Sequence, residues 1–387
     1  MSVEERESLF SLTVAILSAN FPDTYSADVG HQVASWTKCE RSLPHIESMV
    51  RKSKEFRIFE NESQSFAELL LRCSWYLYER ENYSIARSYI DVALQKFSDK
   101  SSLAHASAID LRGLIDLDIR HPAAALEAFE KAYAIRTAVL PSGDAFLAAN
   151  QVNIGLAFTE MGELEKARDY LQQSIDIRLM HNSDRIGNSY SNMASLLLRM
   201  GKPDEAEAML KSCPSLKNFS DEAFLKTGNP RFSGIRLVQG RFEEALQFAS
   251  KALGFRRQCL GERIKVCDSL YQVAVLLDRG GEHGTLHVRC DRIPFDWPQL
   301  LTFTSQLLQE CIKISEGLPR IEGIGHLARA NYKLSQILKD LGKDRESAIF
   351  LERAVALGEE LNQIDGSSSL VKDAISDFEN LVPWMLW

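Results

Sequence analysis

The sequence predicts an all-α protein: a right-handed solenoid of about seven stacked helix pairs, followed by a C-terminal capping helix. Two observations predict this fold. A short pattern recurs at roughly forty-residue spacing between Phe66 and Leu361. Its apolar positions follow the i, i+3, i+4 spacing of helices and not the alternation of strands. One copy has too little apolar surface to form a core alone, so neighbouring copies must stack.

The clearest copy reads Asn153-Ile154-Gly155-Leu156-Ala157-Phe158, followed by Met161-Gly162 and then by Ala167. Gly155 is the small residue at which two helices are expected to cross at the short end of the usual interaxial distance. Counted from copy to copy, the intervals between crossing residues are 39, 42, 39, 39, 41 and 61 residues. The crossing residues are Ser74, Gly113, Gly155, Ala194, Ser233, Ala274 and Ser335.

Each copy also predicts where its first helix ends and where its second helix packs. The residues expected to end the first helix are Glu81, Arg120, Gly162, Gly201, Gly240, Gly281 and Gly342. Small residues near the start of the second helix are Ala86, Ala125, Ala167, Ala206, Ala245 and Ser347. A second set of small residues follows further along that helix: Ala93, Ala132, Ser174, Cys213, Ala252, Cys311 and Ala354.

Taken together, these positions resemble the tetratricopeptide repeat (TPR), in the longer form of kinesin light chains. The resemblance implies a TPR-like α-solenoid over residues 63–365, with an insertion at about 283–306. Residues 1–62 do not show the pattern and read as an N-terminal segment of two or three helices, with breaks at Phe21-Pro22-Asp23 and at Leu43-Pro44. Residues 366–387 are expected to form the capping helix.

A second resemblance lies in Phe21-Pro22, in Trp36 to His45 and in Thr227 to Gly234. These strings are similar to parts of fungal NLR-like proteins, in which a nucleotide-binding module precedes a TPR array. No G-x-x-x-x-G-K-[ST] phosphate-binding loop is present in this sequence. The resemblance therefore implies a sensing or regulatory arm without the nucleotide switch, and an NLR-like protein as one candidate partner.

Composition excludes several classes of function. The net charge of -8 disfavours a nucleic-acid surface. The apolar run from Leu9 to Leu17 is too short to cross a membrane and follows acidic residues, so we expect an amphipathic core helix. Seven cysteines without disulfide-framework spacing favour a reducing, cytoplasmic location. Nucleophile, zinc-protease and dinucleotide motifs are missing, so the prediction is no enzyme, no cofactor and no metal.

The insertion leaves two questions open. His283, His287, Cys290 and Asp291 have metal-like spacing, but Gly284 and the following prolines disfavour a rigid helix, and a plain insertion is the preferred interpretation. Val288-Gln306 is either a genuine insertion or a retained intron, since removing it would restore the normal interval and its ends can be encoded as splice signals.

The concave groove of the array is the expected binding site. The residue two positions before the crossing residue should point into it, and this residue is an asparagine at Asn153 and Asn192. In kinesin-light-chain-like repeats such an asparagine holds the backbone of an extended peptide; the alternative is a bridge between adjacent helices. Arg329 and Lys333 face the groove in the same register, where they would meet an acidic partner or act as exposed solubilising residues.

The sequence thus predicts a non-catalytic protein-protein interaction module that binds a peptide or protein partner. Three alternatives stay open: a free-standing scaffold, an accessory protein of a secondary-metabolite pathway that acts as a small-molecule binder or enzyme, and a degraded gene product without function. Trp384 and Trp387 near the end of the chain are expected to cap the last repeat, the alternative being a docking role.

Overall fold

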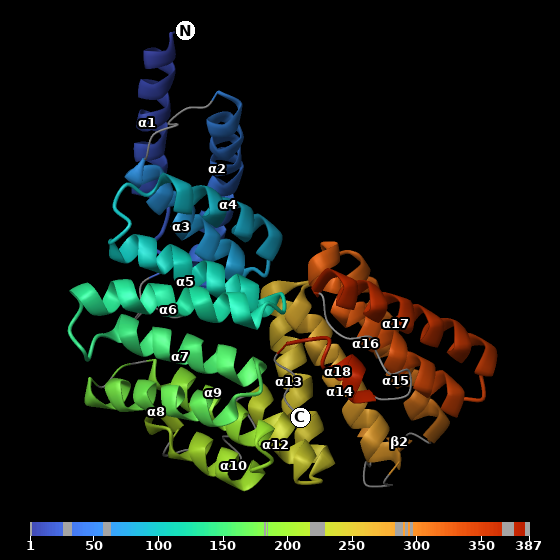
Figure 1. Ribbon diagram of the computed structural model, residues 1–387. Helices are drawn as coiled ribbons and strands as arrows, with labels where there is room; N and C mark the ends of the chain where they lie inside the picture. The colour runs from blue at the N-terminus through green and yellow to red at the C-terminus, as the bar shows by residue number, and fades with distance from the viewer. Residues whose placement is uncertain are drawn as a thin grey trace. The chain divides into compact units, whose positions relative to one another are not determined.

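The computed structural model describes residues 2–25, 33–56, 63–181, 183, 185–216, 229–282, 289–290, 293–294, 297–365 and 375–383. The chain forms two compact units, Met1–Ser189 and Tyr190–Trp387, whose boundary lies inside helix α9. The described residues form seven helix pairs along the chain, and we call the first helix of each pair A and the second B. The predicted fold class is confirmed: the protein is an all-α, TPR-like solenoid (Figure 1).

The first unit begins with two helices that precede the pairs. They are α1 (Val3–Asn20) and α2 (Trp36–Glu55), the latter entered through the 3-10 turn η1 (Val33–Ser35). The pairs of this unit are α3 (Gln64–Glu79) with α4 (Tyr83–Lys96), α5 (Leu103–Asp118) with α6 (Pro122–Val139), and α7 (Ala145–Glu160) with α8 (Leu164–Met180).

The second unit continues from α9 (Ile186–Arg199). Its elements are α10 (Pro203–Ser212), the 3-10 turn η2 (Pro214–Leu216), α12 (Pro230–Val238), α13 (Phe242–Leu260), α14 (Ile264–Glu282), α15 (Trp297–Glu316), α16 (Arg320–Asp340), α17 (Asp344–Asp365) and α18 (Ile375–Glu379). Two-residue strands β1 (Arg289–Cys290) and β2 (Ile293–Pro294) pair antiparallel between α14 and α15. The short α18 packs against α16 as the predicted cap.

The turns between A and B helices share one backbone geometry. Six of them place a residue at positive φ, and those residues are Glu81, Arg120, Gly162, Gly201, Gly240 and Gly342, with φ between 58° and 80°. In each, the next N–H donates to the carbonyl five residues back, as from Glu163 N to Phe158 O at 2.9 Å. This is the Schellman ending of a helix, and it confirms six of the seven predicted helix ends.

Gly281, the seventh predicted helix end, lies within one residue of the end of α14 but does not have the positive φ of the other six. A side chain there would reach to 1.9 Å from the ring of Trp297. Gly281 is therefore small because the first turn of α15 packs directly on α14, and not because the backbone needs a positive φ.

The predicted crossing residues lie where A and B helices touch. A Cβ on Gly155 would lie 2.9 Å from Leu171 and 3.2 Å from the carbonyl of Ala167. Likewise Ser233 Oγ donates to the carbonyl of Ala245 at 3.0 Å across the crossing of α12 and α13. Small residues at both positions let the A and B helices pack closely at their crossing, as the repeat pattern predicts.

The last residues of the insertion form the first turns of α15, which is helix B of the sixth pair. The insertion therefore lengthens this helix and is not confined to the loop before it. Thr304 is fully buried and precedes Cys311 by the same two turns that separate Ala167 from Ser174. The other B helices begin three residues before this small position, whereas α15 begins seven before it, at Trp297. Leu300 and Leu301 of the added turn are 5% and 1% exposed. Whether Val288-Gln306 is spliced out stays a prediction for transcript sequencing.

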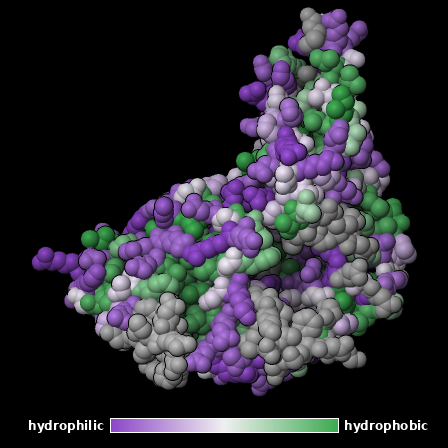
Figure 2. All heavy atoms as spheres, turned by 180° about the vertical axis from the view of Figure 1, so that it is seen from behind, coloured by the Kyte–Doolittle hydropathy of each residue, from purple (hydrophilic) through white to green (hydrophobic). Residues whose placement is uncertain are grey.

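Two expectations for the N-terminal segment need correction. Pro44 does not end a helix but lies inside α2, because buried residues on both sides of it, Cys39 and Ile46, hold both halves of the helix against the core. The second expectation is the amphipathic core helix at Leu9 to Leu17. Helix α1 contains this run but buries only Phe10 and Val14, with Phe10 edge-to-face against Phe66. Its other apolar side chains stay exposed, Leu9, Leu12 and Ile16 at 57%, 59% and 55%, and Figure 2 shows green side chains along this projecting helix.

Candidate functional site

Asn153 lies on α7, half-buried, and its amide is engaged inside the protein. Its Nδ2 donates to Asp110 Oδ1 on α5 at 3.0 Å. The helices α5 and α7 are neighbouring A helices, so in this structure Asn153 makes the helix-to-helix bridge that was the alternative to peptide binding. Asn192 is also half-buried and lies on α9 in the other unit.

The bridge at Asn153 belongs to a larger buried network of α5, α6 and α7. Arg136 at the end of α6 is 2% exposed and donates to Asp110 Oδ2 at 3.2 Å and to Ser107 Oγ at 3.0 Å. It also donates to Asn150 Oδ1, and Asn150 Nδ2 donates to Asp110 Oδ1 at 2.9 Å. Most of the donors and acceptors are paired with one another, although the buried Arg136 Nε has no hydrogen-bond partner among the described residues, so this network mainly joins two repeats.

The same arrangement recurs between other repeats. Arg136, Arg178 and Arg256 each lie four residues after the second small residue of helix B. Arg178 donates to the carbonyl of Arg185 at 2.6 Å, just before α9 begins. Arg256 donates to Ser269 Oγ on α14 at 2.7 Å. An arginine near the end of one repeat thus binds the beginning of the next.

Arg329 and Lys333 are not solubilising residues. Arg329 is fully buried, with its guanidinium 4.2 Å from the ring centroid of Tyr271 and an ion pair to Asp268 at 2.9 Å. Lys333 is 6% exposed and pairs with Asp278. Both partners lie on α14, the preceding A helix. The interpretation of these two residues as exposed charges is therefore wrong, because neighbouring A helices pair their charges across this face.

Around Asp268 the second unit gathers the basic side chains of Arg256, His326 and Arg329, and Arg231 lies near Arg256; we call these four residues the basic cluster. His326 Nε2 lies 3.0 Å from Asp268 Oδ1, on the same oxygen that receives Arg329. Arg231 on α12 donates to Ser195 Oγ on α9 at 3.3 Å. Arg231, Arg256 and Asp268 are half-buried, whereas His326 and Arg329 lie behind them.

Electrostatics in the basic cluster reflect its excess of positive charge. Burial raises the pKa of Asp268, but His326, Arg329 and Arg256 outweigh burial and hold it well below its usual range. Burial, and after it the neighbouring charge of Arg256, lowers the pKa of Arg231 to about 10. Two guanidinium groups, those of Arg256 and Arg329, thus act on one carboxylate, and an added anion would relieve the repulsion between Arg231 and Arg256.

Sequence reasoning missed Asp268, Arg231 and Arg256, although a signal was present. Asp268 and Arg329 both lie six residues before the crossing residue of their repeats, and Arg231 lies two before its own. Polar side chains at these two repeat positions therefore link Asp268, Arg329 and Arg231, whereas Arg256 comes from a B helix and carries no such mark.

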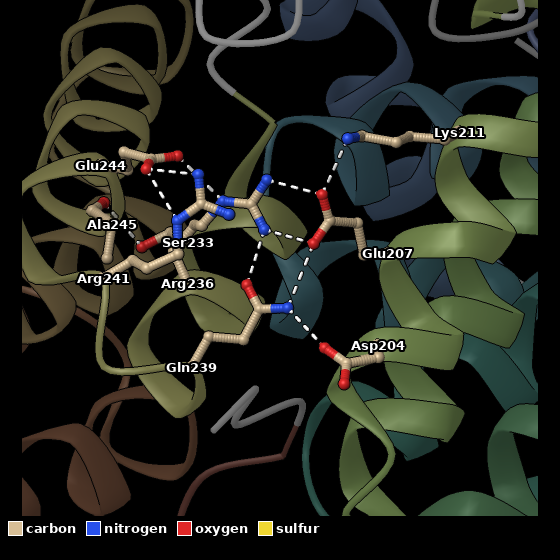
Figure 3. A network of polar contacts seen from close by, with 9 residues as sticks. All are labelled: Asp204, Glu207, Lys211, Ser233, Arg236, Gln239, Arg241, Glu244 and Ala245. Carbon is tan, nitrogen blue, oxygen red and sulfur yellow. Dashed lines mark hydrogen bonds and ion pairs between the residues drawn. The ribbon is translucent and has the colours of Figure 1, made fainter. Parts of the chain in front are cut away.

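A second polar network, shown in Figure 3, joins α10 to α12 and α13. Arg236 is 5% exposed and forms a fork to both oxygens of Glu207, with Nη2 to Oε1 at 2.7 Å, while its Nε donates to Glu244 at 3.0 Å. The Arg236 hydrogen bond holds the pKa of Glu207 far below its usual range, against the effect of burial. Gln239 extends the network to Asp204 at 2.9 Å. Its charges are balanced, so it supports the short, nine-residue α12 and does not attract a ligand.

Two buried cysteines of the first unit are poorly suited to act as nucleophiles. Burial raises the pKa of the Cys39 and Cys73 thiols, which disfavours the reactive thiolate. Among the described side chains, no group of three His, Cys, Asp or Glu could hold a metal ion. The sequence cluster of His283, His287, Cys290 and Asp291 has its side chains outside the described residues, as do Trp384 and Trp387.

No helix in the described part of the chain has both the length and the apolar character needed to cross a membrane.

Comparison with known proteins agrees with the repeat architecture. The tetratricopeptide repeat profile matches residues 144–213 and again residues 328–358. The chain therefore contains tetratricopeptide repeats within its array. No curated protein sequence matches the chain.

Several solved structures share the fold at low sequence identity. The complex of NprR with its cognate peptide NprX is 15% identical, with a TM-score of 0.53, over 86% of this chain and 91% of that chain. The Rap conjugation gene regulator of the plasmid pLS20, in complex with the Phr* peptide, is 16% identical, with a TM-score of 0.50, over 93% and 98%. A putative kinesin light chain from Podosopora anserina is 12% identical over 66% and 98%, but its TM-score of 0.34 carries no weight. These similarities show the fold alone.

Proposed function

We propose that this protein binds an acidic segment of a partner polypeptide on the face formed by its A helices, and that it does so without catalysis. Helical repeat arrays present long continuous surfaces, and TPR-like folds mostly serve as binding scaffolds. NprR and the pLS20 regulator, which share the fold, were solved in complex with peptides. That observation about other proteins supports a peptide or protein partner here.

The observation that carries the proposal is the basic cluster. The chain as a whole has a net charge of -8, yet Arg256 and Arg329 both act on the carboxylate of Asp268, and Arg231 lies close enough to Arg256 to be affected by its charge. Arg231 and Arg256 are half-buried, so they are partly removed from water. Arginine in such surroundings binds carboxylates by charge-assisted, often bidentate hydrogen bonds.

The residues predicted from the sequence take two roles in this proposal. Arg329 supports the cluster from behind, and Lys333 extends the positive face along α16. Asn192 in the second unit, and separately Asn153 in the first, are each proposed to hold the backbone of a segment bound to their own unit through the side-chain amide. For Asn153 this requires exchanging its bond to Asp110 for one to the partner.

The biological setting is proposed on the resemblance alone. The strings Trp36 to His45 and Thr227 to Gly234 resemble fungal NLR-like proteins, which favours a sensing or regulatory arm that works beside a nucleotide-binding partner in the cytoplasm. Co-purification of the tagged chain with such a protein, in a nucleotide-dependent manner, is the expected result. Recovery of partners without any nucleotide-binding protein would remove this part of the proposal.

Binding of an acidic peptide tests the central claim. The probe is a fluorescein-labelled decapeptide of Glu, Ala and Leu, followed by fluorescence anisotropy, with the same peptide carrying Gln for Glu as the control ligand. We expect binding of the acidic probe that weakens as salt rises. Replacing Arg231 and Arg256 by glutamine should weaken it about tenfold or more, since a hydrogen bond to a charged group contributes ~1.5–3 kcal/mol.

A matched variant separates the cluster from net charge. Lys343→Gln together with Arg345→Gln removes the same two positive charges from the exposed start of α17, which is a B helix. This variant should bind the acidic probe within about twofold of the unaltered protein, because exposed charges several turns away are screened. Equal loss in both variants, or equal binding of the Glu and Gln peptides, would refute the proposed site.

A further inference from the structure

The last A helix differs from the others in what covers it. Almost every residue of α16 from Glu322 to Ser335 is buried, including Arg329 and Lys333, which the repeat register directs to the A-helix face. A face that lies open to solvent would leave such long charged side chains exposed. Something in the described part of the second unit therefore covers this face.

The cover is the C-terminal segment, residues 375–383. Phe378 is fully buried and stacks on Tyr332 of α16, with ring centroids 4.1 Å apart and planes inclined by 10°. Leu381 and Val382 are 3% and 4% exposed. At Gly325 the backbone of α16 meets the backbone of the C-terminal segment, since a Cβ on Gly325 would lie 2.3 Å from the carbonyl oxygen of Leu381.

The segment also brings a carboxylate to the positive side chains of this face. Burial raises the pKa of Glu379, while the charges of Arg279, Arg329 and Lys333 act in the opposite direction. Arg279 lies on α14 and the other two on α16, so Glu379 faces two neighbouring A helices at once. Its Oε1 is buried and has no hydrogen-bond partner among the described residues. The carboxylate is thus attracted to this face without being bonded closely to it.

We propose that residues 375–383 act as an intramolecular ligand, holding the A-helix face of the last two repeats until an acidic partner segment with a neighbouring apolar side chain displaces them. This inference rests on the proposed function and adds its regulation. Phe378 fills the apolar position on Tyr332, Glu379 provides the carboxylate, and Arg329 links this position to the basic cluster. A tethered segment competes at high effective concentration, so it lowers the apparent affinity for any ligand in solution.

A full-length variant with Phe378→Ala and Glu379→Gln tests this inference. Releasing the segment should strengthen binding of the acidic decapeptide about tenfold or more, because the apparent dissociation constant is the intrinsic one divided by the open fraction. Phe255→Ala is the matched control, since Phe255 on α13 is 66% exposed and removing it should leave binding unchanged. Circular dichroism checks that each variant is folded. Should the double variant unfold, Glu379→Gln alone carries the test, with a smaller gain.

A labelled peptide with the sequence of residues 375–383 gives a second readout. It should bind the double variant more tightly than the unaltered chain and should compete there with the acidic decapeptide. The same peptide with alanine for phenylalanine and glutamine for glutamate should not bind. Unchanged affinity of the folded double variant for the acidic probe would overturn the inference, whether or not the 375–383 peptide binds.

The two proposals fail separately. If the acidic probe binds through Arg231 and Arg256 but ignores the changes at Phe378 and Glu379, the regulation is wrong and the binding site stands. If neither the unaltered chain nor the double variant binds the acidic probe, while the 375–383 peptide binds the double variant, the proposed binding function is wrong and the intramolecular contact stands.

Discussion

Arg136 is expected to be the most sensitive buried charge of the first unit. It is 2% exposed and its ion-pair partner Asp110 is 4% exposed. Replacing Arg136 by methionine keeps much of the side-chain volume but leaves the Asp110 carboxylate buried without its countercharge. Breaking one side of such a pair costs ~3–5 kcal/mol. Asp110 would keep the amide donors of Asn150 and Asn153, which places the expected loss toward the lower end of that range.

Urea unfolding followed by circular dichroism measures this loss, and hydrogen exchange in α5 and α7 places it in the first unit. Asp110→Asn and the double variant complete the cycle. The free energy of unfolding lost in the double variant should be smaller than the sum of the two single losses by at least ~1 kcal/mol, because both single changes break the same contact. Arg168→Met is the control: its pair with Glu165 is largely exposed, so a change within ~0.5 kcal/mol is expected. A loss below ~1 kcal/mol for Arg136→Met, or strict additivity, would refute this reasoning.

Three further outcomes are expected. Gly162 has φ +80° with no atom within 4 Å of an added Cβ, so Gly162→Ala should cost only the backbone strain of ~1–2 kcal/mol in thermal or urea unfolding; a much larger loss would mean a hidden clash. The pKa of Glu207 lies below its ordinary value of 4.5, so the pairing of Glu207 with Arg236 stabilises the protein fully above pH 4.5 and this stabilisation is lost as the pH falls through the lowered pKa. Glu207→Gln should therefore flatten the acid side of the curve of unfolding free energy against pH. An unchanged curve would contradict this. Native alkylation with iodoacetamide should modify the half-buried Cys259 and spare the buried Cys73, whose pKa burial raises; rapid labelling of Cys73 in folded protein would show that α3 opens.

The repeated features of the fold could be predicted from sequence because each is local. A small residue at a crossing, such as Gly155, and a residue able to adopt positive φ, such as Glu81 or Gly162, leave a mark at a fixed repeat position. Gly281 shows the limit: glycine serves either a turn or a close contact, and only the position of Trp297 shows which applies. Composition alone does not separate the two.

The polar contacts could be predicted only in part. The repeat register directs Arg329 and Lys333 to the A-helix face but does not reveal their burial, because that burial depends on how α14 and α16 pack and pair their charges. Asp268 and Arg231 come from different repeats, and no local pattern states which carboxylate meets which guanidinium. Pairing of this kind depends on the stacking of several helices, so it becomes visible only in three dimensions.

The arginine contacts at the ends of repeats have a consequence for how this array can be altered. Arg136 needs Asn150 beside it, and Arg256 needs Ser269. Shuffling or duplicating the modules would therefore strand a charge in the interior at the new junction, even though every module carries the same apolar pattern. The order of the repeats is therefore constrained, because each junction arginine needs its own polar partner in the next repeat. Engineered chimaeras of this protein should tolerate a cut within a repeat better than a cut between two repeats.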